Sequence, residues 1–167
     1  MQVRDGVTTA LDMEAGAFPV AGWYESRKGK AIINYGLTAG HMPARTKPKN
    51  EVEVRHSVTS PAGKQVQQLK EWKYERATSE EITRLIALLD RGLNEGALGI
   101  GMGIAYTPGA GHEEVFRVFQ FAAQRGVPIF VHVRSNSQVE PNGNIEAVQA
   151  WAGHDRLGLP VVFGRLV

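Results

Sequence analysis

The fold is decided by residues 78–133, TSEEITRLIALLDRGLNEGALGIGMGIAYTPGAGHEEVFRVFQFAAQRGVPIFVHV, in which helical and strand patterns alternate. Thr78 and Glu81 have the spacing of a capping box, in which the threonine side chain caps the helix and the glutamate reaches back. Apolar residues follow at intervals of three and four until Gly96. This spacing predicts a helix that begins after Thr78 and ends near Gly96.

The second half of this stretch repeats the alternation. Residues 112–125 carry an apolar face at helical spacing and are followed by Gly126, a typical helix stop. The glycine-rich residues 97–104 and the apolar residues 127–133 are predicted strands, each placed after a helix. Strands that alternate with helices in this way are typical of parallel α/β folds.

The flanking sequence extends the pattern in both directions. Residues 7–13 and 31–37 are predicted strands, residues 144–157 a helix, and residues 160–167 a last strand. The polar residues 43–77 contain three prolines and are predicted to be an insertion or excursion with helical content. Two architectures fit this order, an open doubly wound sheet and a (β/α)₈ barrel.

Composition excludes several classes of protein. Of 167 residues, 43% are hydrophobic and 22% charged, which is typical of a folded globular domain. A formal net charge of only +2, without a dense basic run, argues against nucleic-acid binding. There is neither a signal-peptide pattern nor an apolar run long enough to span a membrane, so we expect a cytoplasmic protein. The chain has no cysteine, so any metal must be held by histidine and carboxylate groups.

Polar side chains follow four of the predicted strands. Glu14, His41, Tyr106 and His132 each come at or shortly after the carboxyl end of a strand, and Arg134 shares a strand face with His132. Each of these residues alone is more often structural than functional. Together they converge on one edge of a parallel sheet, which is where α/β folds place their sites. Histidine and carboxylate from separate strands are suitable zinc ligands.

The glycines of residues 97–104 do not form a dinucleotide fingerprint. Gly99, Gly101 and Gly103 alternate along a strand, whereas the fingerprint needs its third glycine where Ile104 stands. The alternation indicates instead close packing, or the close approach of a ligand, on one face of the strand.

Three stretches, DGVTTALDMEAG (5–16), EGALGIGMGIAYTPGA (95–110) and GVPIFVHVR (126–134), together resemble the D-aminoacylase, or N-acyl-D-amino-acid deacylase, branch of the amidohydrolase superfamily. The likeness runs from about residue 3 to residue 148. It implies a (β/α)₈ barrel that hydrolyses an amide at a zinc centre, with a small-molecule N-acyl amino acid as substrate. The zinc of such an enzyme acidifies a bound water and polarises the scissile carbonyl.

The resemblance also implies roles for single residues. His132 corresponds to a zinc ligand at the end of the fifth barrel strand. Glu14 falls where D-aminoacylases carry a metal-bridging cysteine, and a carboxylate can also bind zinc. Tyr106, Arg134 and His41 are expected to contact the substrate from the same edge.

Parts of the family pattern are missing from the sequence. There is no His-x-His pair, the sixth-strand segment LGLPVVFGRLV holds no histidine, and no catalytic aspartate can be assigned. We therefore expect an incomplete barrel over 1–167 that covers about the second to the sixth strand, with a divergent tail at 150–167.

Three functional hypotheses stay open at this point. The first is a portion of a zinc-dependent deacylase acting on N-acyl-D-amino acids. The second is a cyclic-amide hydrolase of the hydantoinase or dihydroorotase kind, which the absence of a lysine in residues 97–104 disfavours. The third is an inactive, non-enzymatic fragment, and we expect the isolated chain to lack activity. The oligomeric state is not predicted by the sequence.

Overall fold

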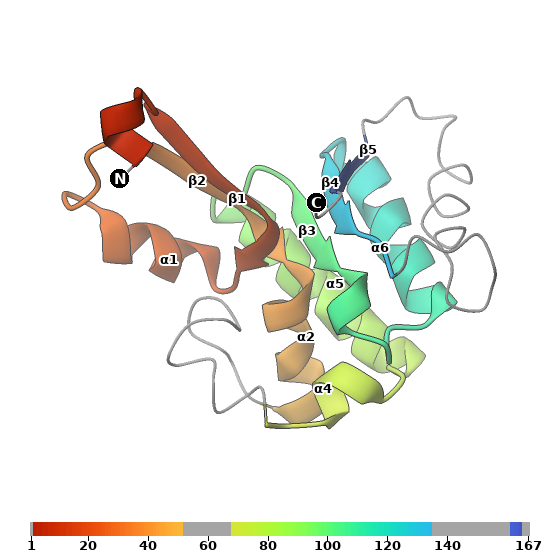
Figure 1. Ribbon diagram of the computed structural model, residues 1–167. Coiled ribbons are helices and arrows are strands. Elements are labelled where there is room, and N and C mark those ends of the chain that lie inside the picture. The colour runs from red at the N-terminus through yellow and green to blue at the C-terminus, as the bar shows by residue number, and fades with distance from the viewer. Residues whose placement is uncertain (1, 52–67, 135–160, 165–167) are drawn as a thin grey trace.

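The computed structural model describes residues 2–51, 68–134 and 161–164, and these contain a five-stranded parallel sheet (Figure 1). The strands lie side by side in chain order. They are β1 (Thr9–Ala17), β2 (Asn34–Gly40), β3 (Ile100–Gly103), β4 (Ile129–His132) and β5 (Val161–Gly164). The predicted order and parallel direction of the strands are confirmed, and the architecture is an incomplete (β/α)₈ barrel.

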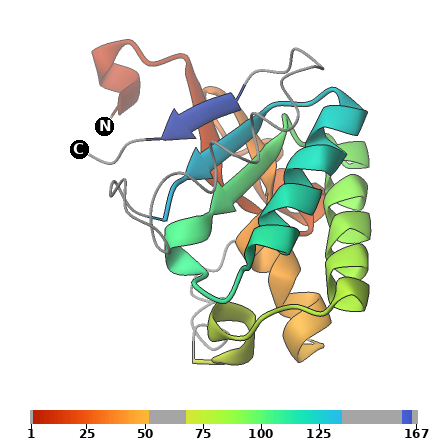
Figure 2. The same ribbon diagram turned by 90° about the vertical axis from the view of Figure 1, so that its right-hand side faces the viewer.

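Helices connect the strands and cover one face of the sheet. They are α1 (Val20–Arg27), α2 (His41–Asn50), α4 (Glu71–Tyr74), α5 (Ser79–Asn94) and α6 (His112–Arg125), with short 3₁₀ turns η1 (Gln2–Asp5) and η3 (Ile104–Tyr106). Figure 2 shows α5 and α6 side by side along the sheet. Leu85, Leu89 and Phe119 from these two helices pack in one core with Ile100 and Val131 of the strands.

Both long helices agree with the sequence. The capping box at Thr78 is present, since its side chain accepts a hydrogen bond from the Glu81 amide and the Glu81 carboxylate accepts one from the Thr78 amide. Helix α6 begins and ends where the apolar spacing predicts, and Gly126 follows it in the left-handed conformation. Local signals determine these boundaries because the caps satisfy backbone groups that a helix end leaves free.

The strands begin later in the chain than predicted. Residues 7–13 were expected as the first strand, but β1 runs to Ala17 and Glu14 lies within it rather than beyond its end. Likewise β2 continues to Gly40, and β3 is shorter than the predicted 97–104 because the chain turns into η3 at Ile104. Small residues such as Ala15 and Gly40 have low β-propensity, so the sequence pattern does not show that the strands continue through them. These strand ends depend on pairing with the neighbouring strand.

The predicted excursion at 43–77 begins inside a helix. Pro43 is the third residue of α2, within the first turn, where no backbone donor is needed for the helix ladder. His41, expected shortly after the end of a strand, directly follows β2 and is the first residue of this helix. The predicted helical content is confirmed in α2 and α4, whereas residues 52–67 and the helix predicted at 144–157 lie outside the described residues.

A bulge of several residues interrupts the pairing of β1 with β2. Asp12 pairs with Leu37 and Ala17 with Ala39, so residues 13–16 of β1 stand opposite a single residue of β2. The Asp12 carboxylate accepts a hydrogen bond from the Gly16 amide at 3.1 Å, and Gly16 has a φ of 57°. Such a backbone turn is suited to glycine. The bulge carries Glu14 over β3.

Close packing explains the glycine-rich strand. A Cβ atom on Gly101 would collide with the carbonyl oxygens of Met13 and Glu14 and with the Thr38 hydroxyl. The bulge can therefore lie directly on β3 only because position 101 has no side chain. Of the two explanations that the sequence left open for these glycines, packing applies to Gly101.

Candidate metal and substrate site

A histidine and a carboxylate meet on the face of the sheet that the helices leave open. His132 is the last residue of β4, and its Nδ1 lies 3.0 Å from Oε1 of Glu14. Their side chains are 16% and 34% exposed, so the pair lies in a recess that solvent can reach. The neighbours Ile129 and Val131 are buried in the core beneath the helices, and strand alternation places His132 on the opposite face.

Tyr106 lies against this pair. Its ring centroid is 4.9 Å from that of His132, with the ring planes at 64° in an edge-on contact, and the residue is 42% exposed. Gly103 is the register partner of His132 on β3, and a Cβ atom there would collide with the Tyr106 ring and the Met42 side chain. The bare backbone at Gly103 therefore allows Tyr106 to approach His132.

Arg134 approaches the chain segment that follows Tyr106. Its guanidinium donates to the carbonyl of Ala110 at 2.7 Å, and more weakly to those of Pro108 at 3.4 Å and Thr107 at 3.5 Å. These carbonyls belong to residues 107–110, which connect η3 to α6. Arg134 thus lies at the same end of the sheet as His132, and its guanidinium is hydrogen-bonded to the backbone of residues 107–110.

His41 lies apart from the Glu14–His132 pair, in a buried ionic cluster. Its Nε2 is 2.8 Å from Oε1 of Glu114, and the same carboxylate accepts from Nε of Arg45 at 2.7 Å. All three side chains are buried, and Arg45 also donates to the backbone carbonyls of Trp72 and Glu75. With no exposed surface, His41 is placed to join α2 to α6 rather than to reach a ligand.

The cluster fixes the charge of Glu114. Burial alone raises the pKa of this carboxyl, but the hydrogen bonds and charges of His41 and Arg45 together outweigh burial and lower its pKa to about 2. Sequence reasoning missed Glu114 and Arg45. The available signal was the spacing of Arg45 four residues after His41, which puts both on one helix face.

The donor set of the Glu14–His132 pair fits zinc, which binds imidazole nitrogen and carboxylate oxygen. A hydrolytic zinc site needs about three protein ligands and a water. Within residues 2–51, 68–134 and 161–164 no group of three or more histidine, aspartate or glutamate side chains converges. The described part of the chain therefore brings together two side chains of a type that can bind zinc, one fewer than such a site needs.

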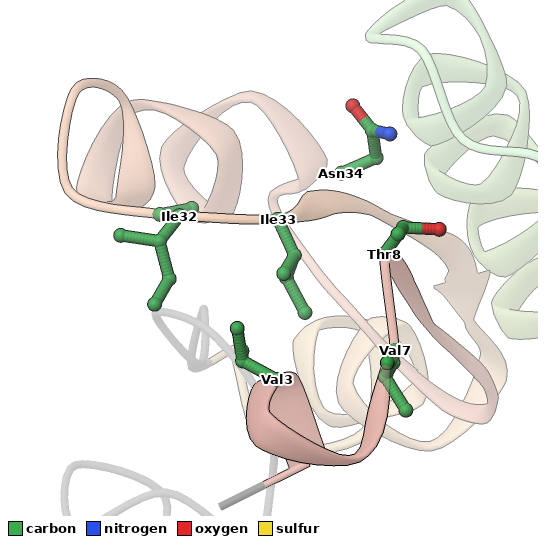
Figure 3. A pocket seen from close by; sticks show the side chains of 8 residues that line it. Val3, Val7, Thr8, Ile32, Ile33 and Asn34 are labelled. Carbon is green, nitrogen blue, oxygen red and sulfur yellow. The ribbon is translucent and has the colours of Figure 1, made fainter.

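A separate hollow lies at the other end of the strands (Figure 3). It has a volume of about 500 Å³ and is lined by Val3, Val7 and Thr8 before β1 and by Ile32, Ile33 and Asn34 before and in β2. It is open and holds no titratable side chain among these residues. Because it lies at the amino ends of the strands, it is distinct from the Glu14–His132 pair.

Comparison with known proteins identifies the family. The amidohydrolase family matches residues 2–159, and the chain belongs to this family. A search of the curated proteins found no match. No helix among the described residues is long and apolar enough to cross a membrane.

Solved structures share the fold at low identity. A D-aminoacylase studied for its binuclear metal center superimposes with a TM-score of 0.64 at 21% identity, covering 96% of this chain and 35% of that one. An N-acyl-D-glutamate deacylase from Bordetella bronchiseptica, complexed with zinc and a phosphonate inhibitor, gives 0.66 at 18% identity, covering 95% and 34%. The chain thus spans about a third of the length of these structures, and the likeness shows the fold.

Proposed function

We propose that this chain is the metal-binding portion of a zinc-dependent amidohydrolase that cleaves the amide of N-acyl-D-amino acids. The observation that carries the proposal is the Glu14–His132 pair: Nδ1 of His132, the last residue of β4, lies 3.0 Å from Oε1 of Glu14 in the bulge of β1, and solvent reaches both side chains. Membership of the amidohydrolase family and the deacylase fold neighbours support the reaction class and the substrate class.

In this proposal Glu14 and His132 each donate one ligand atom to zinc. Bound zinc supplies an acidified water and polarises the scissile carbonyl. The carboxylate contributes negative charge, which strengthens cation binding, and the imidazole binds in its neutral form. In the same proposal Tyr106 contacts the substrate beside the metal, which its partial exposure and its edge-on contact with His132 support.

The bulge in β1 matters to the proposed site. In a strand without this bulge, the residue at position 14 would stay in register with β2 instead of crossing β3 towards β4. Gly101 allows that crossing, and the Thr38 hydroxyl holds it by donating to the Met13 carbonyl at 2.8 Å. The carboxylate is thus preorganised by backbone packing rather than by side-chain contacts alone.

Zinc titration of the purified chain tests the proposal. We expect weak binding, because two ligands do not complete a tetrahedral site, and at least a tenfold loss of affinity in His132→Ala and in Glu14→Gln. His112→Ala is the matched control, since His112 is an exposed imidazole at the start of α6. Calorimetry at constant pH measures all four proteins. Wild-type protein that binds no zinc, or equal losses in His112→Ala, would refute the assigned ligands.

A further inference from the structure

We infer that Arg134 is a positioning residue that holds Tyr106 against His132 by clamping the backbone of residues 107–110. The inference rests on the proposed function only in that the positioned Tyr106 would then lie beside the metal. The contact between the Tyr106 and His132 rings is itself a feature of the structure. The clamp itself is read from three hydrogen bonds to carbonyl oxygens at 2.7, 3.4 and 3.5 Å.

The clamped segment is short and follows Tyr106 directly. Thr107 and Ala110 are buried, and the Ala110 amide donates to the Thr107 carbonyl at 2.9 Å, which closes a tight turn. The Thr107 hydroxyl donates to the Gly103 carbonyl at 3.1 Å and so ties the turn back to the end of β3. A displacement of this turn therefore moves Tyr106.

Two separate segments hold the turn. The Gly109 amide donates to the Lys73 carbonyl of α4 at 2.9 Å, and a Cβ atom on Gly109 would collide with backbone atoms of Tyr74 and Glu75. Arg134, two residues after the end of β4 at His132, donates to the carbonyls of the turn. Arg134 thus links the turn to the segment that directly follows His132.

The chemistry of the turn favours arginine. A planar guanidinium has five donors in a fixed fork and can meet several acceptors at once, whereas an ammonium acts as a point donor. Carbonyls of residues 107, 108 and 110 converge on this one group. Lysine at position 134 should hold the turn partly, and methionine should leave the Ala110 carbonyl without this donor.

Nuclear magnetic resonance of metal-free protein tests the clamp. The Tyr106 ring shifts the carbon-bound protons of the His132 imidazole, and Tyr106→Leu measures the size of that ring-current shift. We expect Arg134→Met to remove at least half of it and Arg134→Lys to remove a smaller part. Arg125→Met is the matched control, because Arg125 pairs with Asp90 on the helical side, and it should leave His132 unchanged.

A second measurement covers the case in which Arg134→Met does not fold. Amide hydrogen exchange at Ala110 should be faster in Arg134→Lys than in wild type, while amides in α5 keep their protection. Unchanged His132 shifts in folded Arg134→Met, or unchanged exchange at Ala110 in Arg134→Lys, would overturn the inference. A direct substrate-binding role for Arg134 predicts these unchanged results. Because neither readout uses zinc, a failure of the proposed zinc site appears separately, in the titration.

Discussion

At the scale of single residues, the site depends on positions that lack side chains. Gly101 lets the bulge of β1 lie on β3, and Gly103 lets Tyr106 lie on His132. Glycines usually weaken a strand because they contribute no packing. Here the missing Cβ atoms allow the Glu14 carboxylate and the Tyr106 ring to approach one histidine, His132.

The effect of Gly101 can be measured by substitution. Gly101→Ala should lower the free energy of unfolding by about 2 kcal/mol or more, because the new methyl group meets backbone carbonyls that cannot rotate away. Gly22→Ala is the control, since a Cβ atom on this glycine of α1 meets nothing within 4 Å. That change should be neutral or stabilising by about 0.5 kcal/mol. Urea denaturation compares the variants, and equal stability of both would contradict the packing argument.

At the scale of elements, helix α5 is determined locally. The capping box at its start pairs the Thr78 side chain with the Glu81 amide at 3.2 Å and the Glu81 carboxylate with the Thr78 amide at 2.7 Å. Thr78→Ala removes the hydroxyl acceptor and should destabilise the protein by about 1 kcal/mol. Thr78→Ser keeps the acceptor and should recover most of this loss. Chemical denaturation measures the free energy of unfolding of the two variants. If Thr78→Ser were as destabilised as Thr78→Ala, the loss would come from the methyl group of threonine and not from the capping hydrogen bond.

The buried ionic cluster of His41, Arg45 and Glu114, which connects α2 to α6, should make the free energy of unfolding depend on pH. The pKa of Glu114 is lowered from 4.5 to about 2 in the folded protein, so its contribution is present above pH 4.5 and is lost as the pH falls towards 2. Full loss corresponds to about 3 kcal/mol. Glu114→Gln should be destabilised by several kcal/mol at neutral pH, because Arg45 stays buried without its carboxylate.

The pH dependence separates this role from simple packing. The difference in unfolding free energy between wild type and Glu114→Gln should shrink between pH 5 and pH 2, as the wild-type carboxylate becomes protonated. Glu113→Gln, next in sequence but with a side chain 63% exposed, should show little difference at any of these pH values. A constant difference for Glu114→Gln over this range would show that charge at position 114 does not stabilise the fold.

Elements also show where sequence reasoning succeeds and fails. The boundaries of α5 and α6 could be predicted because their caps and apolar spacing are local. The bulge at residues 13–16 could not, because it depends on how β1 meets Thr38 and Gly101, which are distant in sequence. For the site, the sequence predicts that Glu14 and His132 converge, but Glu14 lies within β1 and reaches His132 through the bulge rather than from a strand end. The burial of His41 could not be predicted, since it depends on Glu114 from another helix.

At the scale of the whole molecule, the sheet has one covered and one open face. Tyr35 of β2 packs with Trp23 and Tyr24 of α1, whereas its neighbour Gly36 faces the other way, beneath Leu11 and Leu98. These two leucines are 50% and 44% exposed. Leu11 is part of β1, which within the described residues pairs only with β2, so the other edge of β1 has no partner strand there.

An open strand edge and exposed leucines on the same sheet both favour association between chains. We expect the purified chain to self-associate with rising concentration and to bind a hydrophobic dye. Replacing both leucines, Leu11→Gln with Leu98→Gln, should raise the dissociation constant at least tenfold, or about 1.4 kcal/mol, since burial of apolar area drives the contact. Phe116→Gln is the control, because Phe116 is 42% exposed but lies on α6, on the covered side. Sedimentation analysis at several concentrations distinguishes the outcomes. A wild-type chain that stays monomeric, or an equal effect of Phe116→Gln, would show that the open face does not drive association.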